Sequence, residues 1–319
     1  MSIRQHDMRL APETNKQNLS LKRKRRIRQN IPLFIMFIPV LLYYLIFKYL
    51  PMGGLIIAFK DYNFADGIMG SPWVGMQNFK LLFRGTNTVN IIRNTFRLSI
   101  LNIVFGFPVP IILAIMLNEV RKTWFKKSVQ TIIYLPHFFS WVIVGGMVIS
   151  IFSQESGIVN HFVEMFRGEP YPFLYKAGSW ISIFIGSGIW KGAGFGAIVY
   201  LAALTSIDMS LYEAAHIDGA GKWQQIRHIT LPGIKQTIVI MFILQTGNIM
   251  EVGFDQVYML QNNVVSDVAD VISTYVYRVG LQGAQFSIST AMGFFESLVG
   301  LVLVSASNSL ANRFDEGLW

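Results

Sequence analysis

The chain has 319 residues and a formal net charge of +9; 52% of its residues are hydrophobic and only 14% are charged. A soluble globular protein carries nearer a quarter charged residues, so this balance indicates an integral membrane protein and excludes an ordinary soluble domain. The absence of cysteine excludes disulfides, thiolate metal ligands and cysteine nucleophiles. No histidine pair has the helical spacing of a zinc site, so we expect no metal site.

A polar tail, residues 1–30, opens the chain, and six basic residues lie between Lys22 and Arg28. A basic cluster directly before an apolar run holds the N-terminus in the cytoplasm, and we favour this interpretation over a nucleic-acid-binding arm. The first twenty residues are predicted to be disordered. The apolar run that begins at Ile31 is longer than that of a signal peptide and no small-residue cleavage site follows it. It is therefore predicted to be retained as a membrane helix.

Six apolar segments are long enough, or nearly so, to cross a bilayer as helices of about 20 residues. They are about residues 31–58, 95–117, 129–152, 180–204, 236–258 and 288–310. The expected fold is therefore an all-α integral membrane protein with six transmembrane helices over residues 31–310 and a short C-terminal tail, residues 311–319. In the fourth helix, Gly192 and Gly196 have the small-residue spacing that lets membrane helices approach closely.

The charges of the connecting segments orient these helices. With the N-terminus inside, segments 118–127 and 205–235 are also inside, and both are rich in basic residues. The outer segments carry mixed or acidic charge, although the first of them also holds four basic residues. The positive-inside rule predicts a multi-pass protein of the inner (cytoplasmic) membrane with its N- and C-termini in the cytoplasm.

Segment 205–235 has the pattern of two short helices joined by a turn. Ser210 followed by Glu213 predicts a capping box, so a helix should begin there. Gly219 and Gly221 bracket the turn, since glycine accepts the positive φ that a short reversal needs.

A second helix, from about residue 222 to residue 229, is expected to stop near Thr230, because Pro232 disfavours helical geometry just before it. The two helices are too small to have a core of their own, so the segment is predicted to dock onto another protein. The small side chains of Ala214 and Ala215 would let that partner approach closely.

Nine residues of this segment match a long and specifically spaced motif: Glu213, Ala214, Ala215, Asp218, Gly219, Ala220, Ile229, Leu231 and Pro232. The pattern resembles the EAA loop of ABC importer permeases, and this resemblance implies that the segment inserts into a cleft of the importer's ATPase. Glu213 and Asp218 would provide anionic anchors for an arginine or for backbone amides of that partner. One position departs from the pattern, since Ile226 stands where sugar permeases often carry phenylalanine.

Shorter matches extend the resemblance over nearly the whole chain, at residues 48–52, 134–138, 189–191, 201–204 and 253–256. They are similar to permeases for carbohydrates, and several to the branch that handles complex oligosaccharides. The resemblance implies the type I ABC importer permease fold, a second homologous but non-identical permease subunit, an ABC ATPase dimer and an extracytoplasmic solute-binding protein. It also implies that this chain is not an enzyme and binds no cofactor, because ATP and Mg²⁺ would bind to the partner ATPase.

Polar residues of the fifth predicted helix form a second candidate site. Glu251 and Asp255 lie one helical turn apart and share a face, and Gln245 and Asn248 lie near that face at helical spacing. We predict that this face lines the path of an oligosaccharide solute, with Trp190 stacking on a sugar ring. Hydrogen bonds between the helices of the bundle explain the same residues equally well.

A secondary transporter driven by an ion gradient is the alternative function, since four ionisable residues lie in or near predicted helices: Lys191, Glu251, Asp255 and Glu296. Most of them lie near helix ends, which favours the importer. No nucleic acid is expected as a partner, because a DNA-binding helix–turn–helix flanked so closely by membrane helices could not enter a major groove. The motifs are compatible with acidic solutes, such as alginate or pectin fragments, with neutral xylan or mannan pieces, and with a solute that is not a sugar.

Overall fold

The computed structural model describes residues 30–313, which divide between Ile56 and Ile57 into two compact units. Within this range the regular structure is helical, apart from an isolated antiparallel bridge between Lys60 and Trp73. The predictions for the basic N-terminal tail and for the last six residues lie outside the described residues.

The first unit contains most of a long apolar helix, Asn30–Phe59, close to the predicted span 31–58. From Ile31 to Met52 its apolar side chains are exposed on every face, as expected for a helix surrounded by lipid or by other membrane helices. The helix contains a π-helical turn, η1 (Leu45–Tyr49), which is followed by α2 (Leu50–Met52) and by the 3₁₀ segment η2 (Gly53–Phe59).

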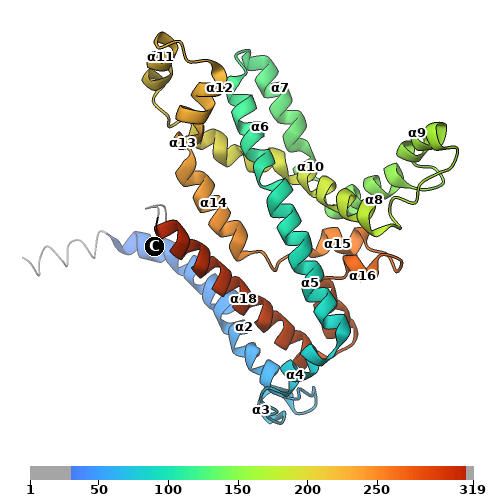
Figure 1. Ribbon diagram of the computed structural model, residues 1–319. Coiled ribbons are helices and arrows are strands. Elements are labelled where there is room, and N and C mark those ends of the chain that lie inside the picture. The colour runs from blue at the N-terminus through green and yellow to red at the C-terminus, as the bar shows by residue number, and fades with distance from the viewer. Residues whose placement is uncertain (1–29, 314–319) are drawn as a thin grey trace, which may run out of the picture. The chain divides into compact units, whose positions relative to one another are not determined.

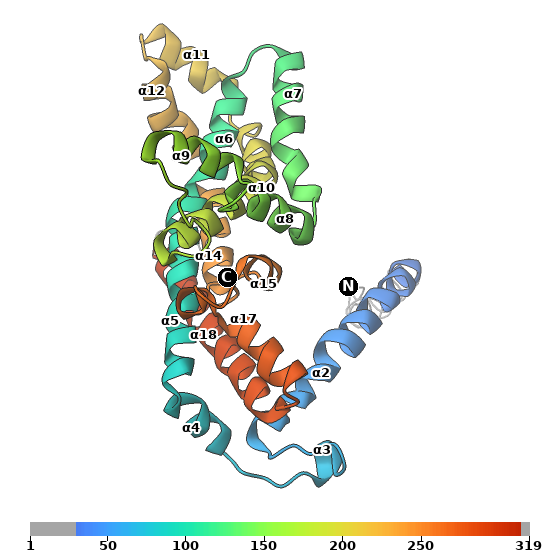
Figure 2. The ribbon, with the colours of Figure 1, turned by 90° about the vertical axis from the view of Figure 1, so that its right-hand side faces the viewer.

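The second unit is a bundle of long helices with short helices in its connections (Figures 1 and 2). Its elements are, in chain order, α3 (Gly67–Gly70), α4 (Gln77–Arg84), α5 (Thr86–Leu101), η3 (Asn102–Gly106), α6 (Pro108–Glu119), α7 (Thr123–Tyr134), η4 (Leu135–Phe138), α8 (Trp141–Phe152), α9 (Ile158–Arg167), α10 (Ala177–Leu204), α11 (Met209–Ile217), α12 (Lys222–Gln225), η5 (Ile226–Thr230), α13 (Leu231–Gly233), α14 (Lys235–Gly247), α15 (Phe254–Leu260), α16 (Ser266–Ala269), α17 (Ile272–Tyr275), η6 (Val276–Gln282) and α18 (Phe286–Asn312).

Four helices of the described chain are long and apolar enough to cross a membrane: Asn30–Phe59, Asn87–Glu119, Ala177–Leu204 and Phe286–Asn312. Two further spans are possible if each of two bent helix pairs counts as one. The all-α membrane fold is therefore confirmed. The predicted number of six spans is reached when each bent helix pair is counted as one span. The last span ends at Asn312, two residues beyond the predicted end.

The third predicted span, residues 129–152, is bent rather than straight. The helix Thr123–Phe138 meets Trp141–Phe152 at 101°. Ser140 caps the second half by accepting a hydrogen bond from the Ile143 amide, and the Lys191 Nζ donates to the His137 carbonyl at 2.8 Å. The bend thus depends partly on a side chain from α10, which the local sequence does not reveal.

The fifth predicted span, residues 236–258, is wrong in its second half. The helix α14 ends at Gly247, residues 248–253 are not helical in a regular way, and α15 begins at Phe254. The Gln256 Nε2 donates to the Phe184 carbonyl at 2.6 Å, so a bond to α10 fixes the chain directly after the break.

Three helices continue through a proline, and in each a π-helical turn precedes the proline. Pro51, Pro108 and Pro232 each lie two residues after the end of a π-helical turn (η1, η3 and η5). A proline inside an α-helix lacks an N–H group, and its ring clashes with the carbonyl four residues earlier. A π turn widens the backbone locally and shifts the hydrogen-bond register, so the helix passes the proline instead of ending.

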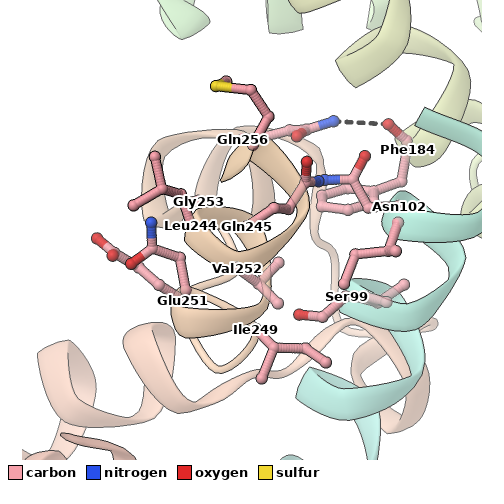
Figure 3. Close-up of a pocket in the computed structure, with 14 residues that line it drawn as sticks. Ser99, Asn102, Phe184, Leu244, Gln245, Ile249, Glu251, Val252, Gly253 and Gln256 are labelled. Carbon is pink, nitrogen blue, oxygen red and sulfur yellow. Dashed lines mark hydrogen bonds between the residues drawn. The ribbon is translucent and has the colours of Figure 1, made fainter. Parts of the chain in front are cut away.

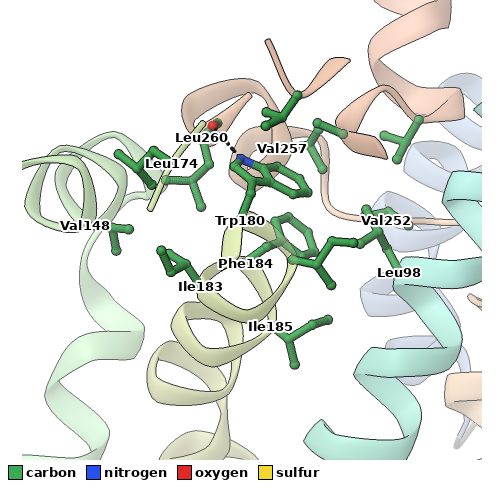
Figure 4. Packing of buried hydrophobic residues seen from close by; sticks show 14 of the residues in the cluster. Leu98, Val148, Leu174, Trp180, Ile183, Phe184, Ile185, Val252, Val257 and Leu260 are labelled. Atoms are coloured by element: carbon green, nitrogen blue, oxygen red, sulfur yellow. Dashed lines mark hydrogen bonds between the residues drawn. The ribbon is translucent and has the colours of Figure 1, made fainter. Parts of the chain in front are cut away.

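The core of the second unit is built around α10. Trp180 is 1% exposed, stacks on Phe184 and donates its indole N–H to the Leu260 carbonyl at 2.8 Å (Figure 4). The closest backbone approach occurs at Gly194, where a Cβ atom would overlap the carbonyl oxygen of Ile133 in α7. The predicted packing pair is therefore only half right, because Gly196 faces Pro110 whereas Gly192 faces open space.

Candidate functional site

The segment 205–235, hereafter the coupling segment, lies at one end of the bundle beside the end of α6, and α4 lies at the other end (Figures 1 and 2). Its first helix is α11. The N-cap of α11 is Asp208, not Ser210: the Asp208 Oδ1 accepts a hydrogen bond from the Ser210 amide at 2.9 Å. This bond lowers the pKa of the Asp208 carboxyl below its ordinary value. The predicted capping box with Glu213 is therefore wrong, although the helix begins within one residue of the predicted start.

The turn after α11 depends on Gly219, whose φ is +77°. The Gly219 amide donates to the His216 carbonyl at 3.1 Å and the Ala220 amide donates to the Ala215 carbonyl at 2.8 Å. These two bonds close the helix C-terminus in the Schellman arrangement, which favours glycine at the left-handed position. Gly221 instead has φ −70° and is the N-cap of α12, so the prediction of positive φ is confirmed at the first glycine only.

The second helix does not stop at Thr230 as predicted. It runs from Lys222 through the π turn η5 and past Pro232 to Gly233, and then bends by 61° into α14. Leu231 and Ile229 are half-buried, and the buried Ile234 belongs to a cluster that includes Leu204 of α10. The motif residues at the end of the segment therefore anchor it to the bundle.

Three side-chain contacts hold the two helices of the segment together and to α6. The Tyr212 hydroxyl lies 3.0 Å from the Thr230 hydroxyl, and the Gln225 amide donates to the Ala220 carbonyl at 3.2 Å. The Lys222 ammonium forms an ion pair of 2.6 Å with Glu119 at the end of α6. Because this pair is partly exposed, it contributes little to stability.

The outer surface of the segment combines carboxylates with exposed apolar side chains. Glu213, Ala214 and Asp218 are exposed. Beside them, Ile217 is 85% and Trp223 73% exposed. Neither residue is among those predicted from the sequence, although a large apolar side chain close to a turn glycine is a usable signal. An exposed apolar patch with a polar rim is typical of a docking surface.

The second candidate site is a polar cavity of about 330 Å³ within the bundle (Figure 3). Gln245, Asn248 and Glu251 line it from the broken end of α14, as the sequence suggests. On the opposite wall, Ser99 and Asn102 come from the junction of α5 and η3. The cavity therefore exists because α14 breaks, and not because Glu251 and Asp255 share a helical face.

Two residues predicted for this site lie elsewhere. Asp255 does not line the cavity and stands in the first turn of α15, where an acidic side chain interacts favourably with the helix dipole. Trp190 lines a separate groove of about 760 Å³ between α8 and α10.

Glu251 and Asn248 also line a larger, more open cavity of about 980 Å³ beside α18, and Glu296 lines it from the other side. The residues lining these two cavities include two carboxylates and no lysine or arginine. The cavities offer hydrogen-bond acceptors, amides and hydroxyls, which suit the hydroxyl groups of a polar solute. Ser99, Asn102 and Gln256 were missed in the sequence because nothing local to them indicates a shared cavity.

An all-helical membrane protein with a projecting, ordered two-helix segment and a polar cavity in its bundle has the construction of a transport permease. The sequence matches the family described as "Binding-protein-dependent transport system inner membrane component" over residues 106–319, and the chain belongs to this family. It is thus a membrane-embedded permease subunit of an ABC importer and not an ion-driven secondary transporter.

Two relatives from Bacillus subtilis (strain 168) are similar over nearly their whole length. The polygalacturonan/rhamnogalacturonan transport system permease protein YteP is 46% identical, with 93% of this chain and 94% of the relative covered. Protein LplB is 44% identical, with 90% and 91% covered. Both are similar to this chain outside the matched family region as well as within it.

Among solved structures, one chain of a bacterial ABC transporter involved in the import of the acidic polysaccharide alginate matches with a TM-score of 0.84. It is 43% identical, and the match covers 92% of this chain and 99% of that chain. A second structure of the alginate transporter, in complex with a periplasmic protein that holds an alginate pentasaccharide, matches with the same score.

Proposed function

We propose that this chain is the translocation subunit of an ATP-driven importer that takes an oligosaccharide from an extracytoplasmic binding protein across the cytoplasmic membrane. The coupling segment carries this proposal. It is ordered by its own hydrogen bonds, anchored to the bundle at Ile234, and exposes carboxylates and large apolar side chains at its tip. A segment built in this way transmits force between a docked partner and the membrane helices.

The partner that docks here is an ABC ATPase. Glu213, Ala214, Ala215, Asp218, Gly219 and Ala220 form the docking tip, and Ile229, Leu231 and Pro232 connect it to α14. The apolar Ile217 and Trp223 enter a cleft of the ATPase, while Glu213 meets a basic group there. ATP and Mg²⁺ bind to the ATPase dimer, and this chain holds no cofactor. On this proposal both termini and segment 118–127 are cytoplasmic, and the basic residues of segments 118–127 and 205–235 support this orientation.

The solute passes along the polar cavity beside α14. Gln245, Asn248 and Glu251 contact it, together with Ser99 and Asn102 from the opposite wall. The names of the relatives support a fragment of a complex polysaccharide as the solute class. A second, homologous permease completes the pathway, since the larger cavity lined by Glu251 and Glu296 is open in the single chain.

The first experiment is purification of the tagged chain from its native membrane in mild detergent, followed by identification of every co-purifying protein by mass spectrometry. We expect an ABC ATPase and a second permease. Uptake into proteoliposomes made from this complex and its binding protein should require ATP and should not respond to an imposed ion gradient. Recovery of the chain alone, in a detergent shown to preserve related complexes, would contradict the proposed assembly.

A further inference from the structure

The groove between α8 and α10 lies apart from the coupling segment and from the polar cavity. Its walls are largely apolar and include Met147, Ile151, Ile183 and Trp190, with a volume of about 760 Å³. One end is formed by Tyr171 and Phe173, whose rings lie 4.9 Å apart, and by Ser179 near the start of α10. The groove therefore has an apolar body and one polar, aromatic end.

Two basic side chains stand at that end. The Lys176 Nζ lies 4.5 Å from the centre of the Tyr171 ring, and the Arg167 guanidinium lies 5.2 Å from it. Neither cation forms an ion pair within residues 30–313, although Glu164 and Glu169 lie on the same stretch of chain. Both cations beside this ring are therefore available to an anionic group at the mouth of the groove.

The mouth is held in place by buried polar bonds and is not a loose loop. Asn160 is 2% exposed; its side chain donates to the Ser153 carbonyl at 2.9 Å and accepts from the Tyr171 amide at 2.7 Å. The Ser179 hydroxyl donates to the Phe173 carbonyl at 2.6 Å. These bonds fix the backbone of Tyr171 and Phe173 relative to the groove.

The length of the groove corresponds to one leaflet of a bilayer. Along α10 its lining runs from Ser179 to Trp190, and the rise of an α-helix makes this distance roughly 16 Å. Half of a hydrocarbon core of about 30 Å is about 15 Å. An acyl chain that lies along this wall would end near Trp190 when its headgroup is level with Lys176.

The neighbouring helix α9 places this end of the groove at the membrane surface. Ile158, Phe162, Met165 and Phe166 recur at helical spacing and are all exposed, the last at 89%. The opposite side of α9 holds the buried Asn160 and the exposed Glu164. A short helix with an exposed apolar stripe suits the boundary between headgroups and acyl chains.

We propose that this groove is a binding site for an anionic phospholipid, with an acyl chain along α10 and the phosphate between Arg167 and Lys176. A zwitterionic lipid would fill the apolar body equally well but would gain less from the two cations. The site does not depend on the identity of the transported solute, so lipid binding can be tested separately from the proposed transport function.

The test uses the full chain with its co-purifying subunits, reconstituted into nanodiscs of phosphatidylethanolamine and phosphatidylglycerol at 3:1. After mild extraction, native mass spectrometry counts the lipid that remains bound. We expect wild type to retain phosphatidylglycerol in excess of its share. The variant R167Q/K176Q should bind it about thirtyfold more weakly, the effect expected for two basic residues near an anionic lipid.

Matched variants separate charge, groove and folding. K80Q/R84Q removes the same charge from exposed side chains of α4 and should bind like wild type. G186F should fill the groove and abolish retention, whereas G146F, at another open glycine outside the lining, should not. The proposal is overturned if R167Q/K176Q or G186F retains phosphatidylglycerol like wild type, if phosphatidylethanolamine is retained equally, or if a cross-linker at Met147 captures a helix of the second permease.

Discussion

The coupling segment and the segment that lines the polar cavity, residues 244–256, both interrupt long helices, but they are held by different kinds of bonds. In the coupling segment most bonds join residues two to five positions apart, such as Ala220 to Ala215 and Gln225 to Ala220. In the cavity segment the decisive bond, from Gln256 to the Phe184 carbonyl, joins residues 72 positions apart. The first segment thus carries its own shape, whereas the second takes its shape from α10.

This difference has a mechanical consequence. A locally bonded segment can move as a rigid body when its partner moves, because none of its internal bonds has to break. A segment held by a distant helix changes shape when that helix shifts, because Gln256 and the break at Gly247 follow α10. A transporter needs both behaviours, one to receive force and the other to reshape the path.

The largest effect is expected from Gly219→Pro. Proline fixes φ near −65°, whereas the turn requires +77°, and the substitution also removes the N–H group that bonds to His216. A cost of about 3 kcal/mol corresponds to roughly a hundredfold loss of the folded turn. Solute-stimulated ATPase activity and uptake should fall together in proteoliposomes, while basal ATPase activity persists.

The control for this variant is Gly221→Ala, at a position with φ −70° and no close neighbour, which should transport normally. Normal stimulated activity and uptake in Gly219→Pro would show that the turn does not couple hydrolysis to transport.

A smaller effect, on stability, is expected from Gly194→Ala. The added methyl group would overlap the Ile133 carbonyl of α7, so the two helices must separate at a cost of about 3 kcal/mol. The thermal midpoint in detergent should fall clearly. Gly192→Ala adds the same methyl group two residues earlier, where space is open, and should leave the midpoint unchanged. Equal midpoints for the two variants would contradict this packing.

The difference between local and long-range bonds also explains which parts of the structure could be predicted from the sequence. The turn at Gly219, the start of α11 and the long helix α10 follow from local rules of glycine conformation, capping and hydropathy. The bend at Ser140 and the end of α14 at Gly247 depend on Lys191 and Gln256, whose partners lie 54 and 72 positions away. No local sequence pattern predicts such long-range bonds.

The residues of the polar cavity illustrate the point further. Polar residues at helical spacing in an apolar run predict Gln245, Asn248, Glu251 and Asp255 as one face. The regular helix ends at Gly247, so Asp255 lies outside the cavity that the other three line. Ser99 and Asn102 belong to the same cavity through the tertiary fold alone. The π turns before three prolines are not predicted from the sequence either. At Pro232 the usual rule wrongly predicts that the helix ends, because it takes no account of a π turn.

A moderate effect on transport is expected from the pair Asn248→Leu and Glu251→Gln. Asn248→Leu removes an amide from the cavity, and Glu251→Gln replaces a charged acceptor by a neutral amide. The loss or weakening of a bond to solute should raise the apparent KM for uptake by roughly tenfold. Initial uptake rates at graded concentrations of binding protein with bound solute would measure this. Asp255→Asn, outside the cavity, is the control and should have no effect. Unchanged kinetics in the first two variants would mean that these residues only join helices.

The smallest effect is expected from Asp208→Ala, and it tests the local half of the comparison. The Asp208 carboxylate accepts the Ser210 amide, so its loss should speed amide exchange in the first turn of α11 by a few-fold, while Ser210→Ala should not. The pKa of this carboxyl is lowered in the folded chain, so the stabilisation is present above the unfolded value of about 3.9 and is lost as pH falls through the folded pKa. Exchange in wild type and variant should therefore differ at neutral pH and converge only in strong acid. If Ser210→Ala has the larger effect instead, the capping box with Glu213 forms in solution, and Asp208 is not the residue that caps α11.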